Sequence, residues 1–206
     1  PRPHAPRRAY ADLRVASFNV LNYFITLNQR GADTADERTR QTDKLVAAIA
    51  ELDADILGLV EVENHPNANR HSDPPLDTLV AALNDATSPG RYDYVPTGRI
   101  GTDQIKGGFL YQPARAAPLG PPAILDSSVD PRAITTHNRP ALAQAFEDVT
   151  TSERLVIAVN HFKSKGSGCD ALGDPDTDDG QGHCNGTRAL MAAALVDWLA
   201  TDPTGA

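Results

Sequence analysis

The chain has 206 residues, of which 40% are apolar and 22% are charged. This length suffices for one domain with its own core or for part of a larger domain, and the composition argues against a disordered chain. No apolar run is long enough to span a bilayer. The formal net charge of −8 argues against nucleic-acid binding through overall positive charge. Phosphate groups would therefore require a local basic patch or a metal ion.

Residues 1–12 contain prolines and arginines without periodicity, which predicts a linker. Such a start is expected in a chain that belongs to a longer protein with further domains. Residues 13–206 are predicted to form the folded domain.

The first half of the chain predicts two strands and two helices. Residues 13–24 alternate early and then turn polar, which indicates a strand. Residues 34–52 have helical periodicity with acidic residues in the first turns, and residues 54–64 form a nearly continuous apolar run, typical of a strand buried on both faces. A short helix is predicted over 75–86. The buried face of the first helix is expected to contain Leu45, Val46, Ile49 and Leu52.

The second half predicts further strands at 92–96 and 105–113, each closed by proline. Two strands at 141–148 and 154–162 are joined by a short polar link and are expected to pair. An amphipathic helix is predicted over 186–200. Its apolar side is expected to carry Leu190, Met191, Ala194, Leu195 and Trp198. This mixture of hairpins and helices favours an α+β fold, or a sheet sandwich faced by helices, over strict βαβ alternation.

Two cysteines, Cys169 and Cys184, flank a loop with little apolar content. Buried free thiols are one reading, but both residues lie outside any apolar pattern, which favours a disulfide between them. Such a bond indicates an oxidising compartment. Closing a loop of about 15 residues would contribute on the order of 3 kcal/mol.

Polar side chains stand at three strand ends: Asn19, then Glu61 and Glu63, then His161. Taken singly, the asparagine is typical of a turn, a glutamate is typical of a solvated strand end, and the histidine is typical of one whose hydrogen bonds are satisfied in the core or at the surface. Glu61 is the most informative, because it interrupts an apolar run where an uncompensated carboxylate costs several kcal/mol (roughly). Magnesium would compensate this charge and prefers oxygen ligands such as Glu and Asn. Glu63, two residues on, is predicted to share the metal or to accept backbone hydrogen bonds.

Four segments occur in a recognisable order: RVASFNVLNYF, ADILGLVEVEN, NRPALAQAF and VNHFKSKG. Together they resemble the endonuclease/exonuclease/phosphatase superfamily, which has the deoxyribonuclease-I-like fold, and most of all its bacterial extracellular nuclease branch. The cysteine-bounded acidic loop resembles that branch too. The resemblance implies a four-layer α/β/β/α sandwich. Because the family's later GD-x-N and SDH motifs do not occur, the chain is expected to cover the N-terminal half to two-thirds of the domain.

The resemblance also implies roles for single residues. Asn19 and Glu61 match the family's magnesium-binding pair, which manganese could also occupy. His161 matches a histidine that contacts the scissile phosphate, and Arg139 matches an arginine that organises the phosphate site. Asp103 lies near a polar position on the substrate side. The catalytic set expected here is therefore His161, Glu61 and Asn19.

Two further features have open interpretations. Lys163 and Lys165 would hold neighbouring phosphates, or else form a solvated strand exit. The acidic loop 174–180 is not an EF-hand, because Asp179 stands where that loop needs glycine and Asn185 where it needs glutamate. A looser calcium site and a solvated loop stapled by the disulfide are the two alternatives.

The function expected from these observations is a secreted or cell-surface, magnesium-dependent nuclease that cleaves DNA, and RNA as a second substrate, with little sequence preference. Two alternatives stay open. One is a phosphatase or sphingomyelinase-like phosphodiesterase of the same fold, and the other is a non-catalytic surface binding module. Because the later family motifs do not occur, this chain by itself is expected to be inactive.

Overall fold

The structure, a computed structural model, describes residues 13–135 and 137–206, so the linker predicted over 1–12 lies outside the described residues. The elements, in chain order, are β1 (Val15–Tyr23), α1 (Ala35–Leu52), β2 (Ile56–Glu63), α2 (Pro74–Ala86), β3 (Asp93–Tyr94), β4 (Ile105–Tyr111), β5 (Ala116–Leu125), β6 (Ala141–Asp148), β7 (Arg154–Val159), the 3₁₀ turn η1 (Asp170–Leu172) and α3 (Asn185–Leu199).

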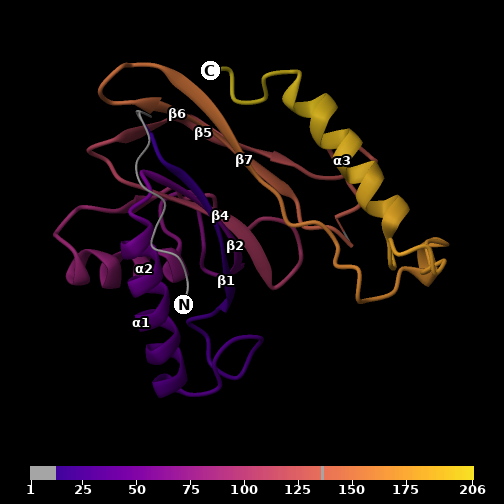
Figure 1. Cartoon of the computed structure of the whole chain (residues 1–206), viewed down its shortest axis with the longest axis horizontal. Helices are drawn as coiled ribbons and strands as arrows, with labels where there is room; N and C mark the ends of the chain where they lie inside the picture. Colours follow the sequence, from indigo (N-terminus) through magenta and orange to yellow (C-terminus); the bar gives the residue numbers. More distant parts are fainter. Residues whose placement is uncertain (1–12, 136) are drawn as a thin grey trace.

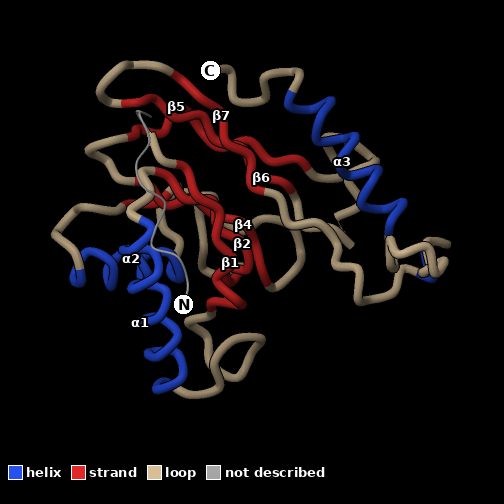
Figure 2. Tube along the Cα trace, viewed as in Figure 1, coloured by secondary structure: helices blue, strands red, loops and turns tan. Residues whose placement is uncertain are grey.

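The strands form two sheets, with the orders β1-β2-β4-β3 and β5-β6-β7. β1 and β2 are parallel, and the other pairs are antiparallel. Figure 1 shows α1 and α2 on one side of the molecule, the two sheets in the middle and α3 on the opposite side, and Figure 2 shows the same layers by element type. The structure therefore confirms the expected α+β fold and the α/β/β/α layers. Among the described residues, none of the helices is long and apolar enough to cross a membrane.

Three clusters of buried side chains correspond to the three contacts between these layers. Leu57 and Leu59 of β2 belong to the cluster that also contains α1 and α2 residues. Ile56 of the same strand belongs to the cluster between the two sheets, where Phe109 and Phe146 meet edge to face with ring centroids 5.7 Å apart. A strand that packs on both faces has no polar face, which explains its continuous apolar sequence. The third cluster joins α3 to the second sheet through Met191, Ala194 and Trp198.

The structure differs from the sequence prediction in β5, which was not predicted. Its ten residues include Pro118, Pro121 and Pro122, and proline argues against a central strand. β5 avoids this conflict because it is the outer strand of its sheet, and its pairing with β6 shifts register around Gly120, which has a φ of +62°.

The predicted face of α3 is wrong at one position. Leu190 is 45% exposed, whereas Met191, Ala194 and Trp198 are buried. The contact surface of this helix is narrower than its apolar composition suggests, and it packs against residues such as Ala141 and Leu125. On α1, Leu45, Val46 and Ile49 are buried as predicted, and Leu52 is partly buried.

Candidate functional site

The candidate site lies where two neighbouring strands both break their regular pairing. The β1–β2 pairing shifts register between Asn19 and Tyr23, and the β2–β4 pairing shifts between Leu59 and Val62. Three non-glycine residues in these irregular stretches have left-handed backbone: Leu21 (φ 54°), Asn22 (φ 51°) and Glu61 (φ 69°). Left-handed L-residues are strained, and such strain and such bulges concentrate at functional sites.

The carboxylate of Glu61 is held by neutral donors from β1. The side-chain amide of Asn19 donates to its Oε1 at 3.0 Å, and the backbone N–H of Asn22 donates to its Oε2 at 3.0 Å. Asn19 Oδ1 accepts in turn from the N–H of Leu21 at 2.8 Å, which fixes the bulge. The side chain of Glu61 is only 16% exposed. The parallel pairing of β1 with β2 thus brings the predicted pair Asn19 and Glu61 into direct contact.

His161 reaches the same carboxylate from the other sheet. Its Nε2 lies 3.8 Å from Glu61 Oε1, which is too long for a hydrogen bond. Burial lowers the pKa of His161, the Arg139 guanidinium lowers it further, and the Glu61 carboxylate acts in the opposite direction. The imidazole is therefore predominantly neutral at pH 7. Among the described residues its buried Nδ1 has no hydrogen-bond partner, which leaves that nitrogen for a ligand or water.

Two glycines explain how β7 approaches β2 closely enough for this contact. A Cβ atom on Gly58 of β2 would lie 2.7 Å from Val159 Cγ2, and one on Gly107 of β4 would lie 3.1 Å from Val159 Cγ1. Any side chain at Gly58 would therefore push the end of β7 away. His161 follows Val159 by two residues, so these glycines set its distance to Glu61.

Arg139, Asp103 and Arg30 form an ion-pair cluster next to the histidine. Asp103 Oδ2 lies 2.9 Å from Arg139 Nε, and Asp103 Oδ1 accepts from Arg30 Nη1 at 3.1 Å. The backbone N–H of Arg139 donates to the carbonyl of His161 at 3.3 Å. Asp103 thus lies between two guanidinium groups and positions them. Arg30 was missed by the sequence interpretation.

Glu63 takes one of its two predicted roles. It is 4% exposed, and its Oε2 accepts the backbone N–H groups of Ile25 at 2.8 Å and Thr26 at 3.2 Å. One oxygen of its carboxylate therefore holds the loop that follows β1.

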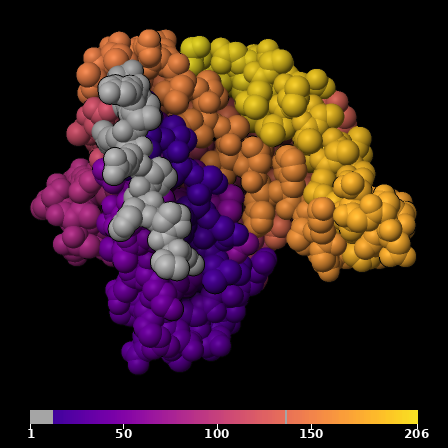
Figure 3. Space-filling view, viewed as in Figure 1, coloured from indigo at the N-terminus to yellow at the C-terminus, as the bar shows by residue number. Residues whose placement is uncertain are grey.

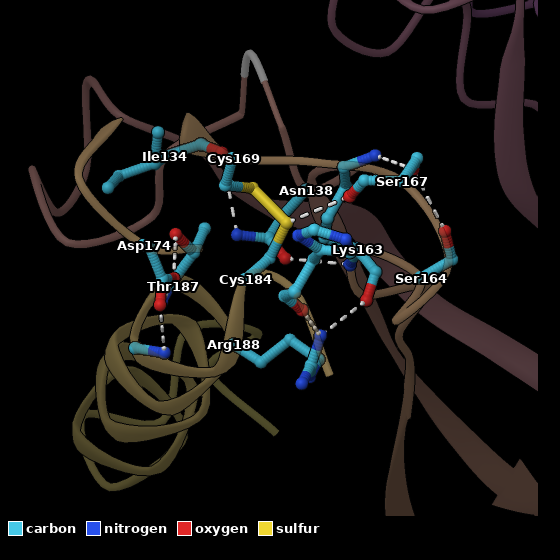
Figure 4. The surroundings of a disulfide bond; sticks show 12 residues. Ile134, Asn138, Lys163, Ser164, Ser167, Cys169, Asp174, Cys184, Thr187 and Arg188 are labelled. Atoms are coloured by element: carbon cyan, nitrogen blue, oxygen red, sulfur yellow. Dashed lines mark hydrogen bonds between the residues drawn. A yellow bond between two sulfur atoms is a disulfide. The ribbon is translucent and has the colours of Figure 1, made fainter. Parts of the chain in front are cut away.

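Lys163 lies beside the disulfide loop (Figure 4), and Lys165 contacts the same loop through its backbone. Lys163 donates through Nζ to the hydroxyl of Ser167, and its backbone N–H donates to Asn138 Oδ1 at 2.9 Å. Lys165 is exposed, and its carbonyl accepts from the N–H of His183 at 3.2 Å. Among the described residues, these contacts link the lysines to the loop rather than to Glu61 or His161. Their phosphate-binding role stays a prediction.

The predicted disulfide between Cys169 and Cys184 is confirmed, with an S–S distance of 2.08 Å. Figure 3 shows that the segment carrying this loop projects from the body of the molecule. Asp174 inside the loop caps α3, because its carboxylate accepts from the N–H of Gly186 at 3.1 Å and from the N–H of Thr187 at 2.7 Å. This use of Asp174 removes one of the aspartates that a calcium site in the 174–180 loop would have employed, and calcium there stays a prediction.

Glu61 and Asn19 carry the side-chain oxygens that a hard divalent cation prefers, while both Glu61 oxygens accept hydrogen bonds in the structure. Among the described residues, no three His, Cys, Asp or Glu side chains converge, and Mg²⁺ typically needs only one or two carboxylates because it retains several waters. The buried side-chain oxygens of Asn22 and Asn160 have no hydrogen-bond partner within the described residues. Unpaired buried acceptors are uncommon in folded proteins, and a bound water or ligand is the usual partner of such a group. In the structure the amide nitrogen of Asn19, not its oxygen, faces Glu61.

No protein-family profile matches the sequence, and no curated protein matches it. The fold, however, resembles that of solved structures. An endonuclease/exonuclease/phosphatase family protein from Bacteroides thetaiotaomicron superimposes with a TM-score of 0.55 at 18% identity, over 91% of this chain and 57% of its own. The human Nocturnin catalytic domain with a bound sulfate anion gives a TM-score of 0.54 at 14% identity, over 93% of this chain and 59% of its own.

These likenesses define the class of fold: a two-sheet sandwich covered by helices, of the deoxyribonuclease-I-like type. The chain therefore shares the fold of an endonuclease/exonuclease/phosphatase family protein. The chain spans less than two-thirds of the length of either solved structure.

Proposed function

We propose that this chain contributes Glu61, Asn19, His161 and Arg139 to the active site of a magnesium-dependent phosphodiester hydrolase. The observation that carries the proposal is the buried carboxylate of Glu61 in left-handed backbone, with His161 Nε2 3.8 Å away. The two solved structures with this fold support it, since one is named as an endonuclease/exonuclease/phosphatase family protein and the other contains a bound sulfate anion.

The residues suit the charge that phosphodiester hydrolysis develops. Negative charge builds on the non-bridging and leaving oxygens, and preorganised cations and donors stabilise it. Glu61 and Asn19 would hold magnesium, or manganese in its place, and the bound ion supplies Lewis-acid stabilisation. Neutral His161 donates a hydrogen bond to a phosphoryl oxygen. Arg139 adds a fixed positive charge, and its ion pair with Asp103 keeps the guanidinium in place.

We further propose that the substrate is DNA, with RNA as a second substrate, cleaved outside the cell or at its surface. The confirmed disulfide supports an oxidising compartment. With a net charge of −8, binding has to rely on local cations that contact phosphates, and such contacts carry little sequence information.

The test measures plasmid nicking, and release from a sphingolipid phosphodiester, by a protein that contains this chain, across a magnesium titration with EDTA as the metal-free reference. Glu61→Gln should lower nicking at least about 100-fold, because it removes the charge that holds the cation, a loss comparable to that of a transition-state donor. The control is Glu51→Gln, the same change at an exposed position of α1. Full nicking by Glu61→Gln would falsify the assignment, and release from the lipid alone would favour the same-fold phosphodiesterase.

A further inference from the structure

A pocket of about 490 Å³ lies directly beside the candidate metal ligands. Residues of three segments line it: Leu21 and Asn22 of β1, residues 30–33 of the following loop, and one face of α1. Asn22 connects the pocket to the candidate metal site, because it lines the pocket and its backbone N–H donates to Glu61 Oε2 at 3.0 Å. A ligand that occupies the pocket is therefore adjacent to whatever is bound at Glu61.

The α1 face of the pocket carries two cations, Arg40 and Lys44. Glu37, Arg40, Gln41 and Lys44 line it, at the spacing that places side chains on one helical face. Within the described residues, neither Arg40 nor Lys44 forms a side-chain hydrogen bond or an ion pair. Like charges four residues apart repel on a helix, so this pair costs stability unless an anion lies between them.

Glu37 attracts Arg40 electrostatically, but the two side chains form no ion pair among the described residues. Glu37 Oε2 accepts from the N–H groups of Asp33 and Thr34, both at 3.1 Å, and these hydrogen bonds lower the pKa of Glu37. That carboxylate is committed to capping α1. Asp33 is the other acidic residue that lines the pocket. The third cation of the pocket, Arg30, is already paired with Asp103. The groups left for a ligand are the two cations of α1.

The inner end of the pocket offers different chemistry. Gln41 Nε2 donates to the carbonyls of Val20 at 3.1 Å and Leu21 at 2.8 Å, which ties α1 to the bulge. The buried Oδ1 of Asn22 has no partner among the described residues, so it can accept a hydrogen bond from a ligand hydroxyl or amino group. Leu21, 73% exposed, adds an apolar surface at the rim. A nucleotide combines an anionic phosphate, hydroxyl or amino donors and a flat apolar base.

We propose that this pocket is a subsite for the nucleotide adjacent to the scissile phosphate, with Arg40 and Lys44 on its phosphate group. The proposal rests on the proposed function in so far as it takes the substrate to be a nucleic-acid strand. It adds that the enzyme selects polynucleotides over small phosphate esters, because only a substrate with a second phosphate can bind at Glu61 and in the pocket at the same time.

The test is a binding measurement with the full chain in EDTA, so that no turnover occurs. Fluorescence anisotropy follows a labelled single strand of eight thymidines over a range of salt concentrations. The double variant Arg40→Gln/Lys44→Gln should bind about tenfold more weakly. Its log–log salt slope should be smaller by about 0.7, because the two residues neutralise one phosphate and each single-strand phosphate contact contributes about 0.7.

The matched control is Arg70→Gln/Arg154→Gln, which removes the same charge at two exposed positions outside the pocket. An unchanged salt slope in the pocket variant, an equal loss in the control, or no binding of the strand by the unmodified chain would each overturn the subsite. A nicking assay separates this result from the proposed function. If nicking is absent but the pocket variant binds the strand more weakly as predicted, the hydrolase proposal is wrong and the subsite is retained. If nicking is intact but the pocket variant and the unmodified chain bind the strand equally, only the subsite is wrong.

Discussion

Glu61 combines two energetic costs at one position. Its carboxylate is 16% exposed, and its backbone is left-handed at φ 69°. The left-handed conformation costs an L-residue about 1–2 kcal/mol, and burial of the charge adds to that. Two neutral hydrogen bonds from β1 offset only part of this. A position that retains both costs is better explained by ligand binding than by folding.

Leu21 carries the same backbone strain without any buried charge. It has φ 54° and is 73% exposed, so its side chain contributes little packing. Asparagine tolerates the left-handed region, so Leu21→Asn should raise the free energy of unfolding by about 0.5–1 kcal/mol. Urea denaturation measures this. The control is Val129→Asn, at an exposed residue outside the positive-φ set. Equal effects of the two substitutions would show that Leu21 is not strained.

The site residues differ in how far sequence could identify them. Glu61 stood out because a carboxylate interrupts an apolar strand, and His161 because it ends another strand. The resemblance added Arg139 and the role of His161. The left-handed backbone at Glu61 had no sequence signal, because neither glycine nor asparagine occupies that position. Arg30 was missed because it lies in an irregular loop, where no periodicity predicts a partner 73 residues away.

At the scale of elements, the disulfide loop and α3 act as one unit. Asp174 accepts from the N–H and hydroxyl of Thr187 at 2.7 and 2.8 Å, and these bonds satisfy donors that the helix end leaves open. Asp174→Ala should lower the melting temperature and speed hydrogen exchange in the first turn of α3. Asp170→Ala, at an exposed residue of the same loop, is the control. Unchanged exchange in the first variant would contradict the capping role.

The same cap predicts a pH dependence. Hydrogen bonds from Thr187 lower the pKa of Asp174 below the ordinary value of 3.8. A carboxylate with a depressed folded-state pKa contributes stability above its unfolded value, and that contribution is lost as the pH falls through the folded-state pKa. The melting temperature of the unmodified protein should therefore fall more steeply below pH 3.8 than that of Asp174→Ala. Parallel melting curves across that range would exclude the mechanism.

A helix or strand could be predicted from the sequence where the pattern of its buried face is sufficient to define it. α1 begins after its capping residue Thr34 and buries the expected side chains because a period of 3.6 residues is a strong signal. β5 was not predictable, since its prolines are tolerated only through its place at the sheet edge, which is a property of the assembled sheet. The face of α3 was partly wrong because an apolar helix gives little indication of which side packs.

At the scale of the whole molecule, two layers are joined by a buried ion pair. Lys106 of β4 donates to Asp73 at the N-terminus of α2, and both side chains are 0% exposed. Burial lowers the pKa of Lys106 and raises that of Asp73, while their mutual attraction opposes both shifts. Lys106 Nζ also donates to Thr97 Oγ1 at 3.0 Å and to the carbonyl of Gly98 at 2.5 Å. The lysine thus ties the sheet, the helix and a loop together.

Lys106→Met should lower the free energy of unfolding by about 3–5 kcal/mol, because it leaves the Asp73 carboxylate buried without its cation. Lys106→Met/Asp73→Asn should recover a substantial part of that loss, since no buried charge remains. Urea denaturation of both variants measures this, with Lys165→Met as the exposed control. In the single variant Asp73 keeps a raised folded-state pKa, so the folded state binds its proton more tightly than the unfolded chain does and stability should rise as the pH falls. Equal stability of the single and double variants at neutral pH would show that the charge of Asp73 is compensated by something other than Lys106.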